Sequence, residues 1–194
     1  PVMAQLYSRI PVQKMQRGER MVYDAMASLP ADWVVFHSCK EDYMDGSYYV
    51  HYEADFVVLV PERGIVVIEV KDWPHIQVVK QAQDAWKEHV HSPLEQANIA
   101  LQKLMRSLQR CACLPKKERN WPEHRHMAIL VQGVPEGDME NNLPFDSMYL
   151  CGEGALGQLQ HRIEHLFVQN KPERMSAHWI SKISDALAPS VLFR

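Results

Sequence analysis

An acidic residue and a lysine follow directly on the most apolar run of this chain. Residues 64–68 are Gly-Ile-Val-Val-Ile, and Glu69-Val70-Lys71 continue them. Side chains two apart on a strand share a face, so Glu69 and Lys71 lie on one side of the predicted strand. Two interpretations are open. Either the strand surfaces at Glu69 and its charges meet water, or the pair belongs to a site for a divalent metal ion.

The segment before this run completes the clearest hairpin of the sequence. Residues 56–60 and 65–71 predict two strands joined by a turn at residues 61–64. A turn of odd length pairs residues whose numbers sum to an even value, and that register puts Asp55 on the face of the acid and the lysine. Gly64 suits the left-handed position of a three-residue turn with a bulge. A turn of even length would send Asp55 to the other face.

A helix with a well-marked start follows the hairpin. Ser92 is a capping residue, Pro93 suits the first helical position and Glu95 completes a capping box. The helix is predicted to continue to about Arg110, with its apolar stripe facing a core. Gln96 lies on a different side of this helix, in one row with two basic residues.

The clearly basic region of the chain lies on this helix and just beyond it. The net charge of -3 gives no global attraction to nucleic acid, so a phosphate partner has to be held by a local patch or by metal. A solvated face is the usual explanation of such a row of charges. The alternative is a surface that binds a phosphate backbone, and its candidate residues are Lys103, Arg106, Arg110, Lys116 and Lys117.

The other predicted elements are those of an α/β domain. A helix over Gly18–Leu29 carries Glu19 in its first turn, and a strand over Trp33–His37 precedes a polar loop that contains Asp45-Gly46. Further strands are predicted over 76–79, 86–90, 126–132 and 148–151, and further helices over 157–168 and 176–187.

Length and composition favour one domain. With 194 residues, 46% of them hydrophobic, the chain can bury one good-sized core. We expect a single domain over residues 1–194, in which a C-terminal strand and helices at 146–188 pack onto a core of residues 18–132. The longest apolar runs are too short to cross a bilayer and the N-terminus lacks the apolar core of a signal peptide. We therefore expect a cytoplasmic protein without a membrane partner, with its four cysteines as reduced thiols.

Two patterns imitate ligand sites. Residues 152–157 fit the G-x-G-x-x-G dinucleotide fingerprint, but no strand is predicted after them to complete a βαβ unit, so we expect a glycine-rich turn. Histidines at 89, 91, 124 and 126 accompany Cys111 and Cys113, but one intervening residue is a poor match to the cysteine spacing of structural zinc sites. We expect no zinc.

Four blocks, taken in this order, resemble the nuclease-related domain (NERD) family. They are Gly18-Glu19, Glu53-Ala54-Asp55, residues 64–73 and residues 92–97. The resemblance covers residues 18–108, with weaker agreement over 127–131, and the proline of the family motif has no counterpart because Ala54 precedes Asp55. This family belongs with the PD-(D/E)XK nucleases. It implies an α/β fold with a mixed central β-sheet flanked by helices and a restriction-endonuclease-like core.

The resemblance also implies a nuclease that depends on Mg²⁺ or Mn²⁺ and acts on nucleic acid, with DNA favoured over RNA. Carboxylates and carbonyls are the hard oxygen ligands that these ions prefer. The implied metal ligands are Asp55, Glu69 and the carbonyl of Val70. The implied catalytic residues are Glu19, Asp55, Glu69, Lys71 and Gln96.

Each of these residues also has an ordinary structural alternative. Glu69 and Lys71 alone would be an exposed ion pair, Glu19 a favourable charge at a helix N-terminus and Gln96 a solvated side chain. Two other functional classes are open as well. One is an inactive nuclease-fold module that binds nucleic acid or a partner protein, and the other is an interaction domain joined to a helicase or another module. The sequence has no G-x-x-x-x-G-K-[ST] phosphate loop, so it carries no motor of its own.

Overall fold

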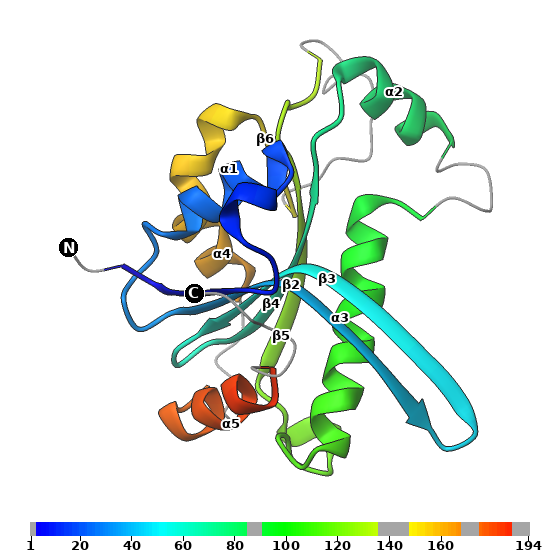
Figure 1. Cartoon of the computed structure of the whole chain (residues 1–194), viewed down its shortest axis with the longest axis vertical. Helices are drawn as coiled ribbons and strands as arrows, with labels where there is room; N and C mark the ends of the chain where they lie inside the picture. The colour runs from blue at the N-terminus through cyan, green and yellow to red at the C-terminus, as the bar shows by residue number, and fades with distance from the viewer. Residues whose placement is uncertain (1–2, 85–90, 136–147, 168–174, 188–194) are drawn as a thin grey trace.

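The computed structural model of the chain describes residues 3–84, 91–135, 148–167 and 175–187. Its centre is a six-stranded sheet in the order β1-β2-β3-β4-β5-β6 (Figure 1). The β2–β3 and β3–β4 pairs are antiparallel, and the other three pairs are parallel. The strands are β1 (Gln5–Ser8), β2 (Val34–Asp45), β3 (Tyr48–Val60), β4 (Gly64–Lys71), β5 (Glu123–Leu130) and β6 (Tyr149–Cys151).

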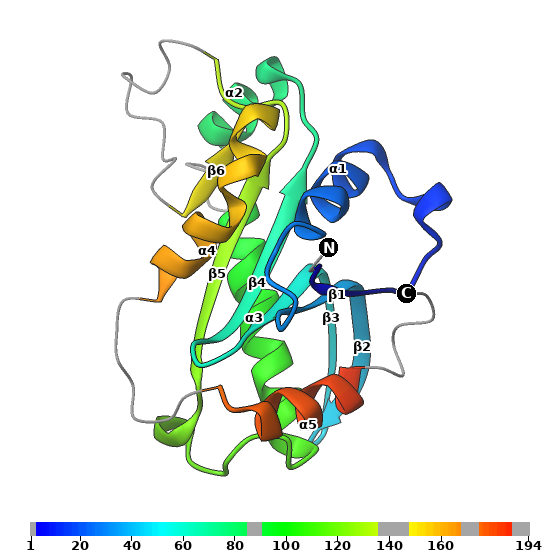
Figure 2. The same cartoon turned by 90° about the vertical axis from the view of Figure 1, so that its left-hand side faces the viewer.

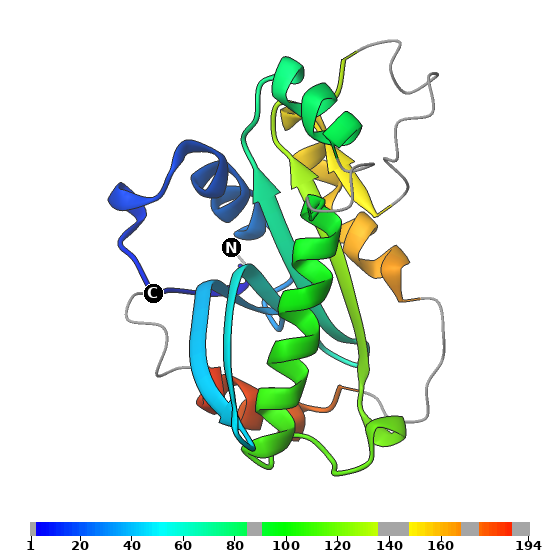
Figure 3. The ribbon, with the colours of Figure 1, turned by 90° about the vertical axis from the view of Figure 1, so that its right-hand side faces the viewer.

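Helices cover both faces of this sheet, which confirms the expected α/β class. Figure 2 shows α1 and α4 on one face, and Figure 3 shows α3 on the other. The α-helices are α1 (Arg17–Met26), α2 (His75–Asp84), α3 (Pro93–Arg110), α4 (Leu159–Leu166) and α5 (Ala177–Leu187), and the short 3₁₀ helices are η1 (Val12–Lys14), η2 (Glu118–Asn120) and η3 (Glu153–Gln158). No helix in the described ranges has the length and apolar character needed to span a membrane.

Alternate residues of the central strands fill two cores. Val58 and Ile68 pack into the core beneath α1 and α4, whereas Val57 and Val67 pack into the core beneath α3 and α5. All four are fully buried, and burying a side chain of this size contributes about 1.5–3 kcal/mol. The strands are therefore apolar on both faces, as a sheet covered by helices on both sides requires.

The β3–β4 hairpin has the predicted register. Val60 pairs with Gly64 across a three-residue turn, so paired numbers sum to an even value. The predicted role of Gly64 is wrong, because Glu62 takes the left-handed position with φ of 62°. Gly64 is needed for a different reason: a Cβ at this position would lie 1.8 Å from the carbonyl oxygen of Glu123 on β5.

The polar loop predicted after His37 is wrong, because these residues are strand. β2 continues to Asp45 and pairs with β3 down to Tyr48, and Gly46 occupies the tip with φ of 63°. This far half of the β2–β3 hairpin extends past the rest of the sheet and lies alongside α3 (Figures 1 and 3). Its polar sequence follows from its surroundings, since one of its faces packs on α3 and the other faces solvent.

The strand predicted over residues 76–79 is also wrong, because this segment forms the start of α2. Pro74 directly precedes the helix, and its carbonyl accepts the N–H groups of Gln77 and Val78. Val78 and Ala82, four residues apart, are buried, whereas Ile76 is 81% exposed. That spacing is helical, and strand alternation would have buried Ile76 together with Val78. The strand predicted over 86–90 lies outside the described residues.

The predicted start of α3 and the predicted free cysteines are confirmed. Ser92 Oγ accepts the N–H of Glu95 at 3.1 Å and caps α3, whose apolar stripe is buried. The four cysteines are free thiols. Gly152 takes φ of 95° and leads from β6 through η3 into α4. Within the described part of the chain, no strand follows β6.

Candidate active site

The central strand β3 turns over at Asp55. Val57 points into the core beneath α3 and Phe56 into the core beneath α1, as alternation requires. Ala54 then points beneath α3 again, although it is three residues from Val57. The alternation of side-chain faces along β3 is therefore shifted by one residue at Asp55. The regular alternation from which the face of Asp55 was predicted does not extend past this residue.

Strand β2 shows the same change directly opposite. Phe36 and Cys39, also three residues apart, both belong to the core beneath α3. Ser38 lies between them with φ of 59°, in the left-handed region that a serine seldom occupies. The ladder pairs on both sides of Ser38 are intact, so this residue lies opposite Asp55. Both strands shift their alternation of side-chain faces at the same place, and the pairing between them stays in register.

The carboxylate of Asp55 replaces a backbone hydrogen-bond acceptor at the point where the β3–β4 ladder ends. The β3–β4 ladder ends at Phe56, and Asp55 Oδ2 accepts the N–H of Val70 at 2.8 Å. The N–H and C=O of one strand residue point to the same side, so the carbonyl of Val70 faces Asp55 as well. The carbonyl of Lys71 points the other way, where it accepts the N–H of Val131 at 2.9 Å.

Glu69 and Lys71 form a recessed ion pair. Lys71 Nζ lies 3.1 Å from Glu69 Oε1, and the two side chains are only 23% and 12% exposed, respectively. Burial, with the nearby charge of Asp55 as a second cause, raises the pKa of Glu69 to about 7. An exposed surface pair does not describe this arrangement, because the strand has not surfaced at Glu69.

The pKa of Asp55 is also raised. Burial is the main cause and the charge of Glu19 adds to it, while the hydrogen bond from Val70 opposes the shift. Two carboxyl groups with raised pKa values and facing one another mark a place where negative charge is poorly compensated.

Glu19 approaches Asp55 from α1, which covers the face of the sheet opposite to α3. Glu19 Oε2 lies 3.3 Å from Nε2 of His37, and Nδ1 of His37 lies 2.7 Å from Ser8 Oγ. His37 is fully buried. His37 was not among the residues predicted from the sequence, because a single histidine in an apolar strand is ordinary.

The start of α1 is held against the end of β4. A Cβ on Gly18 would lie 2.6 Å from Cβ of Asp72, so only glycine permits this approach. Arg17 Nη1 donates to both carboxylate oxygens of Asp72, at 2.9 and 3.1 Å. These contacts give a structural reason for the Gly18-Glu19 block: the glycine lets α1 approach closely enough to bring Glu19 near Asp55.

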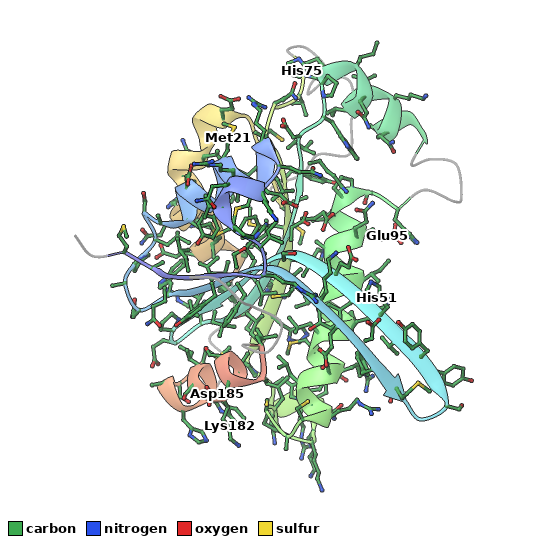
Figure 4. The ribbon with its side chains drawn as sticks, in the orientation of Figure 1. Met21, His51, His75, Glu95, Lys182 and Asp185 are labelled. Carbon is green, nitrogen blue, oxygen red and sulfur yellow. The ribbon has the colours of Figure 1, made fainter. Side chains whose placement is uncertain are left out.

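Glu69 borders a cleft of about 480 Å³ between α3 and the β2–β3 hairpin, whereas Asp55 lies behind it and does not line the cleft. Of the predicted residues, Glu69, Lys71, Gln96 and Lys103 line it together. Gln96 Nε2 donates to the carbonyl of His91 at 3.1 Å, and Lys103 Nζ donates to the carbonyl of His51 at 3.0 Å. Figure 4 shows His51 on the hairpin and Glu95 at the beginning of α3.

The four other predicted basic residues do not line this cleft. Arg110 pairs with Asp45 at 3.2 Å and lies over the ring of Tyr43, so it holds the hairpin tip to α3. Arg106 is exposed on α3, and Lys116 and Lys117 follow the C-terminal end of this helix. The eighteen residues of α3 span about 27 Å, so the two lysines lie far from Glu69.

The oxygen donors at this place suit a hard divalent cation. Among the described residues, no three side chains of His, Cys, Asp or Glu are grouped to hold a metal ion. The donors are instead two carboxylates, of Asp55 and Glu69, and the carbonyl of Val70. Mg²⁺ commonly uses one or two carboxylates and completes its shell with water and substrate oxygens. A cation here would also relieve the charge that raises both pKa values.

Comparison with known proteins agrees with the resemblance seen in the sequence. The family model described as nuclease-related domain matches residues 14–131, from the last residue of η1 to the residue after β5. This range contains every residue of the candidate site and of the cleft. No curated protein and no solved structure matches the chain. Because the family model covers more than half of its length, the chain belongs to the nuclease-related domain family.

Proposed function

We propose that this chain is a metal-dependent nuclease that hydrolyses phosphodiester bonds in DNA or a related nucleic acid. The observation that carries the proposal is the recessed group of Asp55, Glu69 and Lys71 at the edge of a cleft. Its two carboxyl groups have raised pKa values. A module that only binds phosphate has no need of buried carboxylates there, because they repel its ligand.

Asp55, Glu69 and the carbonyl of Val70 would hold the cation, Mg²⁺ or Mn²⁺. When bound, such an ion supplies a Lewis acid and lowers the pKa of water. The protein's own part is to fix the donors. Asp55 is fixed by its hydrogen bond from Val70, and Glu69 is fixed by its pair with Lys71.

Lys71 is the cationic group beside the acids. Its ammonium is held 3.1 Å from Glu69 and 5.5 Å from the centre of the Trp73 ring. An ammonium in this position orients the attacking water or neutralises charge that develops on the phosphate, and a site shielded from bulk water strengthens both effects.

Glu19 and Gln96 act from opposite sides of the sheet. Glu19 reaches the site through water from the α1 side, where His37 orients its carboxylate. Gln96 stands on the cleft wall and contributes a hydrogen bond to the substrate. Arg106, Arg110, Lys116 and Lys117 would contact the nucleic-acid backbone only outside the cleft. A helicase module in the same or a partner polypeptide, in the cytoplasm, would supply strands to such a site.

Cleavage of labelled single-stranded and double-stranded DNA in Mg²⁺, Mn²⁺ or EDTA tests this proposal. Glu69→Gln and Lys71→Met remove one charge each and nearly keep the side-chain volume, and Lys14→Met is the matched control on an exposed lysine of η1. The proposal requires metal-dependent cutting that both site variants lose and the control keeps. DNA binding by the wild type without cutting would instead identify an inactive module.

A further inference from the structure

The cleft beside Glu69 is a slot with two walls. One wall is α3, which contributes Gln96 and Lys103, and the other is the β3 arm of the hairpin, which contributes His51. Glu69 and Lys71 form the floor, and the Glu69 side chain is 12% exposed. The cleft is open to solvent, and its volume of about 480 Å³ is that of a small-ligand site, about 300–1,000 Å³.

Hydrogen bonds fix the distance between the two walls. Lys103 Nζ donates to the carbonyl of His51 at 3.0 Å, and Tyr43 Oη donates to the carbonyl of Lys103 at 2.9 Å. Further along the helix, Ser107 Oγ donates to the carboxylate of Glu41 at 2.7 Å. The hairpin cannot swing away from α3 without breaking these bonds, so the slot keeps its width.

We infer that this slot admits one strand of nucleic acid and excludes a duplex. A duplex carries its phosphates on the outside of a wide, stiff cylinder, and it would have to enter between α3 and the hairpin before a phosphate could reach Glu69. A single strand is thin and flexible enough to lower one phosphate to the floor. The inference rests on the proposed function only in taking the ligand to be a nucleic acid.

The walls carry the groups that a single strand needs. Lys103 uses one of its three protons on His51, which leaves two for phosphate oxygens. Ile99 is partly exposed on the helical wall and gives it an apolar surface against which a base can lie. The Glu53 carboxylate on the hairpin wall is paired with Lys40 at 3.2 Å and lies 3.4 Å from Nε2 of His51, so its charge is compensated.

Binding, measured apart from cleavage, tests the inference. Fluorescence anisotropy with a labelled oligodeoxythymidine of about 20 nucleotides, and with its blunt duplex, is recorded with Ca²⁺ and with EDTA. We expect the single strand to bind at least about tenfold more tightly than the duplex. Lys103→Met should weaken single-strand binding about tenfold, Lys103→Arg should restore most of it, and Lys14→Met should leave it unchanged.

Cleavage then provides a second readout that separates the two proposals. A covalently closed duplex circle and a single-stranded circle of the same sequence have no ends, and we expect only the single-stranded one to be cut. Equal binding of duplex and single strand would overturn the inference, and so would unchanged binding by a folded Lys103→Met. If the single-strand preference holds but neither these circles nor linear DNA, single-stranded or duplex, is cut, the slot is as inferred and the nuclease function fails.

Discussion

Asp55 Oδ2 accepts the backbone N–H of Val70 at 2.8 Å, at the point where β3 and β4 part. The bond does two things at once. It satisfies a strand N–H that would otherwise lose its ladder partner, and it points the carboxylate into the gap beside Glu69. The candidate site therefore depends on a break in the sheet.

The raised pKa of Glu69 predicts a pH-dependent stability. The pKa is about 7 in the folded chain against an ordinary value of 4.5. Below pH 4.5 the carboxyl is protonated in both states and has no effect. Between pH 4.5 and about 7 the unfolded chain releases a proton that the folded chain keeps, so the free energy of unfolding falls as pH rises.

Glu69→Gln removes this dependence. Without the ionising group, the variant should be more stable than the wild type by about 1–3 kcal/mol above pH 7 and equal to it below about pH 4.5. Denaturant unfolding across this pH range measures the difference. A variant less stable than the wild type at high pH would show that the Lys71 pair outweighs the burial of the charge.

Metal binding should release a proton. A carboxyl must ionise to bind a cation, and Glu69 is largely protonated below its pKa of about 7. Titration calorimetry with Mn²⁺ at about pH 6, in two buffers of different ionisation enthalpy, should show release of up to one proton, and little at about pH 8. The affinity should rise between these two values. An affinity for Mn²⁺ that does not change with pH would place the cation away from Glu69.

The close approach of Gly18 to Asp72 predicts the effect of a single methyl group. Gly18→Ala puts a Cβ 2.6 Å from Cβ of Asp72, so the start of α1 must shift, at a cost of about 1–3 kcal/mol. Since Glu19 moves with α1, the rate of cleavage should fall more than substrate affinity does. Gly157→Ala is the control, because nothing lies within 4 Å of its added Cβ. A Gly18→Ala chain with wild-type melting temperature and rate would contradict this account.

Local sequence rules predicted the hairpin register and α3 because both are decided by neighbouring residues. An odd turn length fixes the pairing of Val60 with Gly64, and Ser92 with Pro93 fixes the first turn of α3. The prediction of a strand over 76–79 was wrong because the β-branched residues there favour a strand, whereas the helix start at Pro74 decides the structure. The polar far half of β2 was missed because the helix that covers it lies more than fifty residues away in the chain.

The face change at Asp55 left no mark in the sequence. Tyr52 and Ala54 alternate correctly among themselves, as do Val57 and Leu59, and all four are buried beneath α3. Because helices cover both faces of β3, a slip of one residue exposes no apolar side chain that would reveal it. The contacts of Glu19 with His37, or of Lys103 with His51, likewise join residues that only the folded sheet brings together.

The buried contact between His37 and Ser8 predicts strong coupling of the two residues. His37 is fully buried, and the Ser8 side chain is almost as inaccessible, 2.7 Å from its Nδ1. His37→Leu should lower the free energy of unfolding by about 1–3 kcal/mol, because it leaves the serine hydroxyl and Glu19 with one partner fewer. Adding Ser8→Ala to His37→Leu should cost less than Ser8→Ala alone costs, with a coupling energy of about 1 kcal/mol in the double-mutant cycle. Urea unfolding of the four chains measures the cycle. Strict additivity would show that the ring and the hydroxyl are neighbours without a hydrogen bond, and the orientation of Glu19 would then need another cause.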